Sequence, residues 1–434
     1  MAKSKMLRWV AAVLAAIGNC SAFAADDHVK IGVLTDLTGP YSAITGKGSV
    51  AAARLAIENF GGSLLGKPIE LVVADHTSKP DIGANLARQW YDVDGVDAIF
   101  DGAGSSVALA ILEIARSRSK IVAFAGVISP DVTGKLCGET ISSWAWDTHA
   151  MVATSLESLM KLGGKRVFFV SLDSAAGRAL ENDATEIIKA AGGTILGSVR
   201  HPLNTADFSS FLLQAQAANP DIVVFANAGS DTVTSIKQAG EFGLTIGKNA
   251  VTVAGLLALI NDVDALGLKL AQGVVVAESF YCDLNDETRA WNQRFQERVG
   301  APANMLQAAV YSSVLHYLKA VRSAGTQDGP RVAAAMKATP IEDFYSDKVL
   351  LRADGRAVRD FYLFKVKSPE QSKQRWDDYL VLNKLSGAQA FPPARSECCT
   401  TAILFDLPLQ KLATASVSRS PISIQLAPTK AELR

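Results

Sequence analysis

Two neighbouring serines, Ser105 and Ser106, follow a glycine-rich stretch at residues 101–104 and precede the helical run VALAILEIARS. Glycines let the main chain come close to a ligand, and a serine can cap the start of a helix. The free N–H groups and the dipole of a helix N-terminus favour an anion such as a carboxylate, by about 0.3 to 1 kcal/mol, or up to about 2 kcal/mol when it is partly buried. The stretch therefore predicts an anion-binding loop, although a simple helix cap without a ligand has the same pattern.

No enzyme motif accompanies this loop. It differs from the dinucleotide fingerprint because Val107 occupies the third glycine position and the loop follows the third predicted strand, which disfavours a nicotinamide cofactor. The patterns GxSxG and HExxH and the Walker motif are absent from the sequence, and its five histidines form no ligand cluster with its cysteines. We therefore expect neither an enzyme nor a bound metal or cofactor.

Aromatic residues stand where they could cover a ligand. Tyr41 lies in a loop after the first predicted strand, where a tyrosine can cover an apolar ligand with little loss of entropy or pack as a lid on its own domain. Trp144 and Trp146 are expected to flank a passage between two domains, with Trp146 facing the ligand, although both could instead fill the hinge. Phe280 and Tyr281 predict a second passage, with the same two alternatives.

Short β-branched runs alternate with helical periods along the chain and would position these residues. The predicted strands are 29–34, 69–74, 98–101, 121–124, 166–171, 194–199, 222–226, 251–254 and 274–277. The predicted helices are 49–60, 82–91, 107–116, 151–162, 179–191, 208–217 and 232–242. Parallel strands need long crossover connections, so this alternation predicts an α/β fold with parallel sheets.

Ligands of open parallel sheets bind beyond the carboxyl ends of the strands. The loops at those ends are 38–41, 101–106, 125–130, 173–177, 227–230 and 255–262. They supply Ser174 and Asn227 as further candidate ligand-binding residues. The length of the chain predicts two lobes, because one domain usually holds about 100 to 200 residues.

The N-terminus has the three parts of a secretion leader. Lys3, Lys5 and Arg8 precede the apolar run 9–18, and Ala22-Phe23-Ala24 offers a cleavage site, so we expect cleavage after Ala24 and export to the periplasm. Three of the 43 basic residues lie in this leader, which leaves 40 basic against 43 acidic residues. This balance, without any Lys/Arg run, does not suggest a nucleic-acid partner.

Four cysteines follow the leader: Cys137, Cys282, Cys398 and Cys399. In an oxidising compartment we favour one long-range disulfide, from Cys137 to Cys398 or Cys399. Four buried or free thiols are the alternative that the spacing leaves open.

Several long motifs together resemble one family. IGVLTDLTGPYSAITGKGSVAAARLAIENFGG, DGAGSSVALAILEIA, AWDTHA, PDIVVFANAGSDTVTSIKQAGEFG and QAAVYSSVLHYLKAV occur in the order found in the leucine/isoleucine/valine-type periplasmic solute-binding proteins of ABC importers. The likeness spans about residues 29–398. It implies a type I periplasmic binding protein fold, in which two Rossmann-like lobes are joined by three hinge crossings.

The resemblance also implies roles for single residues. Ser105 and Ser106 match the loop that binds the ligand carboxylate, and Gly126, Val127 and Ile128 match the loop that contacts its carboxylate and amino group. Tyr41 matches the aromatic residue of the first lobe, whereas Ser174 stands where a tyrosine of the second lobe is usual.

In the family that this chain resembles, an acid of the second lobe meets the α-ammonium group of the ligand. Asp262 is the candidate for this acid here. Both amino acids and aromatic or other organic carboxylates therefore stay open as ligands.

The closing motif AQAFPPARSECC matches Cys398 to the family's cysteine, which gives the pair Cys137 and Cys398. The implied domains are a signal peptide at 1–24, lobe 1 at 25–146 with 279–345, lobe 2 at 147–278 with 346–399, and a flexible tail at 400–434. The implied function is capture of a small carboxylate by a monomer and its delivery to the transmembrane subunits of an ABC permease. A ligand sensor coupled to a receptor or regulator is the alternative.

Overall fold

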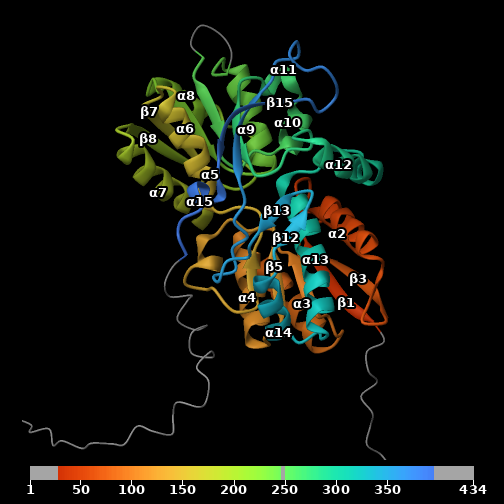
Figure 1. Cartoon of the computed structure of the whole chain (residues 1–434). Coiled ribbons are helices and arrows are strands. Elements are labelled where there is room, and N and C mark those ends of the chain that lie inside the picture. Colours follow the sequence, from red (N-terminus) through yellow and green to blue (C-terminus); the bar gives the residue numbers. More distant parts are fainter. Residues whose placement is uncertain (1–27, 246–249, 395–434) are drawn as a thin grey trace, which may run out of the picture.

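The computed structural model describes residues 28–245 and 250–394, which form two α/β lobes (Figure 1). The first sheet has the order β2-β3-β1-β4-β5-β6 and the second the order β15-β14-β11-β10-β9-β7-β8. The predicted α/β class is therefore confirmed.

The first sheet consists of β1 (Val29–Thr35), β2 (Ser63–Leu64), β3 (Lys67–Asp75), β4 (Ala98–Asp101), β5 (Ile121–Phe124) and β6 (Ile141–Ser143). Its strands pair in parallel except for the short β2. Helices α3 (Pro80–Asp92) and α4 (Ser105–Ser117) cover one face, and α2 (Gly46–Phe60) and α13 (Met305–Ala324) cover the other. Successive residues of β4 accordingly enter two cores, since Ile99 packs with α3 and α4 while Phe100 packs in the other core.

The second sheet consists of β7 (Arg166–Leu172), β8 (Thr194–His201), β9 (Ile222–Ala226), β10 (Thr252–Gly255), β11 (Val275–Glu278), β14 (Phe361–Val366) and β15 (Tyr379–Leu385). Its helices are α5 (Thr148–Val152), the π-helical turn η2 (Ala153–Glu157), α6 (Ser158–Lys161), α7 (Ala175–Ala190), α8 (Ser209–Ala217), α9 (Ser230–Glu241), α10 (Ile260–Leu266), α11 (Leu268–Ala271) and α15 (Gly387–Ala390). The single helix predicted at 151–162 is thus interrupted by a π turn.

The second sheet is mostly parallel, as predicted, but its edge carries two antiparallel strands. Strand β14 runs antiparallel to β11, and β15 runs antiparallel to β14. Neither strand was predicted. Strand β15 follows β14 without a helix between them, so the alternation of strands and helices does not reveal this pair.

The remaining elements complete the first lobe and the connections. They are the 3-10 turn η1 (Pro130–Thr133), α12 (Asp286–Val299), α14 (Gly329–Ala338), β12 (Ile341–Asp343) and β13 (Ser346–Val349). Helix α12 packs on α2, and α14 packs on α13. The chain passes between the sheets at 144–147, 279–285 and 350–360. The lobe boundaries proposed from the sequence stay a prediction.

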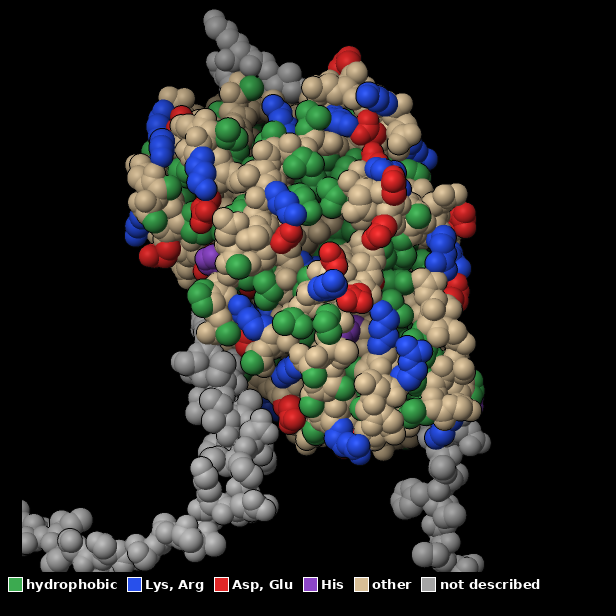
Figure 2. All heavy atoms as spheres, viewed as in Figure 1, with side chains coloured by type: hydrophobic (Ala, Val, Ile, Leu, Met, Phe, Trp, Pro, Cys, Tyr) green, Lys and Arg blue, Asp and Glu red, His purple; other side chains and the backbone are tan. Residues whose placement is uncertain are grey.

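On the face seen in Figure 2, positive and negative side chains are interspersed. None of the helices formed by the described residues is long and apolar enough to cross a membrane. Those residues also contain no group of three or more His, Cys, Asp or Glu side chains that could hold a metal ion.

Candidate functional site

The strand orders place two pairs of loops opposite each other. In the first sheet, β3 and β4 lie on either side of β1, and in the second, β8 and β9 lie on either side of β7. The connections after β1 and β4, and after β7 and β9, leave in opposite directions and open a crevice in each lobe. A cavity of about 200 Å³ lies between them and is lined by residues of both lobes, including Tyr41, Ser105, Ser174 and Asn227.

The N-terminus of α4 forms the first-lobe wall. Gly104 takes a φ of 83°, which favours glycine, and provides no side-chain cap for the helix. Ser105, Ser106 and Val107 line the cavity, and the amides of a first helical turn have no partner within the helix. The predicted anion-binding loop thus faces the cavity with main-chain donors.

The N-terminus of α7 forms the wall on the opposite lobe. Ser174 lines the cavity, and its Oγ accepts a hydrogen bond of 3.1 Å from the Gly177 amide, so it is the N-cap of this helix. Ala175 and Ala176 also line the cavity. Two helix dipoles therefore direct their positive ends into one space.

Tyr41 closes one side of the cavity. Its loop is held by Asp36, whose carboxylate accepts hydrogen bonds from the amides of Gly39 (2.7 Å) and Tyr41 (3.1 Å). Burial raises the pKa of Tyr41, with smaller contributions from the charges of Asp231 and Asp36, so its hydroxyl stays protonated at neutral pH. The Pro40 carbonyl lies so close to Gly229 that a Cβ there would approach it to 2.5 Å. The two lobes thus touch at this loop.

Trp146 lines the cavity, as expected, and is buried with an exposed fraction of 3%. Its Nε1 donor has no hydrogen-bond partner within the described part of the chain. Trp144 does not line the cavity and lies instead at the first crossing, where its Nε1 donates to Ser142 Oγ at 2.8 Å. Phe280 packs against Phe344 and Tyr281 against Tyr379, and neither Phe280 nor Tyr281 lines the cavity.

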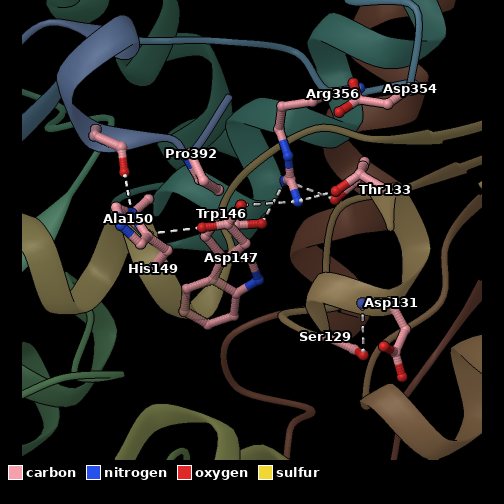
Figure 3. Close-up of polar contacts among 12 residues, drawn as sticks. Ser129, Asp131, Thr133, Trp146, Asp147, His149, Ala150, Asp354, Arg356 and Pro392 are labelled. Carbon is pink, nitrogen blue, oxygen red and sulfur yellow. Dashed lines mark hydrogen bonds and ion pairs between the residues drawn. The ribbon is translucent and has the colours of Figure 1, made fainter. Parts of the chain in front are cut away.

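Arg356, on the third crossing, holds the Trp146 main chain (Figure 3). Its guanidinium donates to the Trp146 carbonyl at 2.5 Å and to Ser143 Oγ at 2.8 Å, and it lies 3.3 Å from Asp147 Oδ2. Asp147 Oδ1 in turn accepts the Ala150 amide at 2.8 Å and caps α5. The first and third crossings are therefore joined directly behind the cavity.

Gly126 and Ile128 line the cavity, but Val127 does not. Val127 points instead into the core between α3, α4 and β5, as expected for alternate residues of an extended segment. Asn227 lines the cavity, yet its side-chain amide donates to His201 and Ser235 and accepts from Thr232. A ligand contact from Asn227 would therefore come from its main chain.

Asp262 does not reach the cavity, which corrects its placement in the candidate site. It is buried at 3% exposure and its carboxylate accepts the amide of the N-cap residue Leu259 at 3.0 Å at the start of α10. Spacing alone could not distinguish a cap from a ligand contact. The sequence did not reveal Leu306, which reaches the cavity from α13. Ser78 follows β3 and Leu172 ends β7, so the rule that ligands bind at strand ends could have found both of these lining residues.

Asp262 lies beside a second buried acid, Glu278. Glu278 Oε1 accepts hydrogen bonds from the Ile260 amide (3.0 Å) and the Tyr379 hydroxyl (2.9 Å), while Oε2 has no partner among the described residues. Burial raises the pKa of Glu278 to about 8, aided by the charge of Asp262, and burial raises the pKa of Asp262 to about 7. Both acids are thus stabilised in their protonated forms.

These raised pKa values predict a pH dependence of stability. The contribution of both acids is fully present below their ordinary pKa values of 3.8 and 4.5 and is lost as the pH rises through about 7 to 8. We expect the free energy of unfolding to fall by about 4 kcal/mol between about pH 6 and about pH 8.5. In Glu278→Gln, which keeps the shape and loses the titration, urea unfolding should show at most about half of this fall. An equal fall in both proteins would contradict the assignment.

Cys137 is disulfide-bonded, and Cys282 is a free, buried cysteine. The predicted partner Cys398 lies outside the described residues, as do the predicted leader at 1–24 and the tail at 400–434. The pairing of Cys137 with Cys398 stays a prediction.

Comparisons with known proteins agree in one family. A family model described as periplasmic binding protein matches residues 28–374. Leu/Ile/Val-binding protein homolog 7 of Brucella melitensis is 26% identical over 351 residues, covering 77% of this chain and 85% of that protein. A periplasmic binding protein from Burkholderia mallei is 44% identical with a TM-score of 0.81, covering 84% of this chain and 96% of that one. A branched chain amino acid ABC transporter periplasmic ligand-binding protein from Burkholderia xenovorans is 39% identical with a TM-score of 0.77, covering 84% and 97%.

Proposed function

The chain belongs to the periplasmic binding protein family, and on this premise we propose that it captures a small carboxylate-bearing solute between its two lobes. It is a solute-binding component of an ABC transporter and not an enzyme. The sequence resemblance is thereby confirmed at the level of the family and the fold.

One observation carries the proposal. The N-termini of α4 and α7 approach a shared cavity from opposite lobes and supply main-chain amides with no partner in their helices. Together with the positive ends of two helix dipoles, these donors suit a carboxylate. Apolar side chains such as Ile44, Ile128 and Leu257 cover the rest of the wall and suit an apolar body.

The capture mechanism follows from the position of the cavity. A solute that contacts both lobes binds more tightly when they are close together than when they are apart, and only this difference in binding free energy drives closure. The three crossings would be the hinge. We further propose that the protein is exported by cleavage of the leader after Ala24, acts as a monomer in the periplasm, and delivers its solute to the transmembrane subunits of the importer.

Isothermal titration tests the proposed function directly. The protein is first unfolded in urea and refolded, which removes any solute that was purified with it. A panel of leucine, phenylalanine, 4-methylpentanoate, 3-phenylpropanoate and benzoate should contain at least one ligand that binds one per monomer. If no carboxylate of the panel binds, and only a nicotinamide cofactor raises the melting temperature, the proposal is wrong.

A substitution at Ser105 tests whether main-chain donors hold the carboxylate. Ser105 is the first residue of α4, a position where proline fits a helix and removes only the N–H. We expect Ser105→Pro to weaken binding of the tightest panel ligand by about 10-fold, because a hydrogen bond to a charged group contributes at least about 1.5 kcal/mol.

Ser105→Ala is the matched control for this substitution. It removes the hydroxyl and keeps the amide, so its affinity should stay within about 3-fold of wild type, a change of less than about 1 kcal/mol. Equal affinities of both variants would show that the amide of Ser105 does not bind the ligand.

A further inference from the structure

We infer that the solute is an apolar carboxylate without an ammonium group, so that the site selects organic acids against the matching amino acids. This inference rests on the proposed function and narrows its ligand class. It follows from the charge, hydrogen bonding and burial of the residues around the cavity.

The cavity wall lacks an ionised acid. Among the described residues that line it there is no Asp, Glu, Lys, Arg or His. An ammonium group loses hydration on entering such a site, and without an anion or a free acceptor this loss is not compensated. A carboxylate does not need a cationic side chain here, because the helix amides supply its donors.

Several polar groups of the wall can only donate or already take part in hydrogen bonds. The Trp146 Nε1 can only donate, as can the first amides of α4 and α7. The Ser174 hydroxyl accepts the Gly177 amide, Thr45 Oγ1 donates to the Tyr41 carbonyl, and the Asn227 carbonyl oxygen accepts from Thr232. At these positions an ammonium group would meet donors, whereas ligand oxygens would meet partners. The remaining hydroxyls of the wall, such as those of Ser105 and Ser106, can both donate and accept, so they offer an ammonium group only neutral acceptors.

Three acids lie behind the wall and are not available to a ligand. Asp36 accepts the amides of Gly39 and Tyr41 and the hydroxyl of Ser78. Asp231 accepts the amides of Asn204 (3.1 Å) and Thr205 (2.9 Å). Asp101 accepts the Thr35 hydroxyl at 2.6 Å, and its other oxygen is sealed in the interior.

The N-termini of three helices add a positive electrostatic potential at the cavity. Besides α4 and α7, helix α9 begins beside the cavity, after the lining residue Ala228, with Gly229 as an N-cap that has no side-chain cap. Positive helix ends favour an anion and disfavour a cation. The wall opens towards solvent at Ser106 and at Leu203, which is 44% exposed, so water keeps part of its contact with a bound group there. We therefore expect the organic acid to bind about 10-fold more tightly than the matching amino acid. In a dry interior, the factor would be much larger.

Matched pairs of ligands test the inference. Leucine and phenylalanine differ from 4-methylpentanoate and 3-phenylpropanoate only by the ammonium group. Titration of the refolded full-length protein should give at least about 10-fold tighter binding of the deaminated acid in at least one pair. If the amino acid binds equally well or more tightly in each pair that binds, the inference is overturned while the proposed function stands. If neither these four ligands nor benzoate binds, the proposed function itself fails, and the inference fails with it.

A charge placed on the wall provides a second test. Asp and Asn are both good N-caps, so Ser174→Asp and Ser174→Asn keep the start of α7 and differ only in charge. Ser174→Asp should move the affinity ratio by about 10-fold towards the amino acid, and Ser174→Asn should leave it within about 3-fold. An unchanged ratio in Ser174→Asp would contradict a selection that depends on the missing acid.

Discussion

Replacement of Arg356 by methionine should lower the free energy of unfolding by about 3 to 5 kcal/mol, because it leaves the buried carboxylate of Asp147 without its cation. Arg356 is fully buried and Asp147 is 3% exposed. The guanidinium also supplies the donors for the Trp146 carbonyl and Ser143 Oγ, which would lose their partner. Urea unfolding followed by tryptophan fluorescence measures this loss.

Two control variants separate the buried charge from general damage. Arg356→Met combined with Asp147→Asn removes both charges, and Asn still caps α5, so the double variant should recover at least about half of the loss. Arg289→Met removes an exposed arginine paired with Asp283 and Asp286 and should cost less than about 1 kcal/mol. A loss below about 1 kcal/mol in Arg356→Met, or a double variant no more stable than the single one, would contradict this account of the hinge.

Replacement of Gly229 by alanine should weaken binding of the tightest panel ligand by about 100-fold. The new Cβ would lie 2.5 Å from the Pro40 carbonyl of the opposite lobe, and this main-chain atom cannot rotate away. The lobes must then separate around the Tyr41 loop, at an overpacking penalty of about 3 kcal/mol that acts on the closed state alone. Titration gives the affinity. Small-angle X-ray scattering should show that the ligand compacts the wild type more than the variant.

Gly192→Ala is the matched control for Gly229→Ala. Gly192 follows the C-terminal end of α7, away from the cavity, and its φ of 70° is close to the 62° of Gly229. A Cβ added at Gly192 would meet no atom within 4 Å. Both variants therefore strain the main chain, and only one obstructs the contact between the lobes. Equal affinities of the two variants would show that contact at Gly229 is not required for binding.

Local patterns predicted the central parallel strands well, whereas the predicted helix starts differ from the observed ones by one to four residues. The predicted strands 98–101, 121–124 and 222–226 have the bounds of β4, β5 and β9. Their β-branched composition and the following glycines act on the chain within a few residues, so the sequence carries this information directly. The same holds for the start of α4, whose residues Ser105 and Ser106 lie at the cavity.

The orientation of side chains was harder to predict. Asn227 and Asp262 were both chosen because they follow strands, yet one turns its amide into a buried network and the other caps α10. The competing partners, His201, Thr232 and the Leu259 amide, become neighbours only through packing. Strand-end position therefore indicates the site and does not assign each side chain to it.

The sequence by itself determined that the chain alternates strands and helices and where its donor-rich loops lie, because propensity, glycine placement and helix capping are local properties. Only the tertiary structure decided that Ser105 and Ser174 share one cavity, that Leu306 completes its wall, and that Arg356 joins the first and third crossings. These contacts connect residues far apart in the chain, and they depend on strand order and on how the two lobes meet. The charge of the cavity, and with it the kind of solute, depends on that assembly.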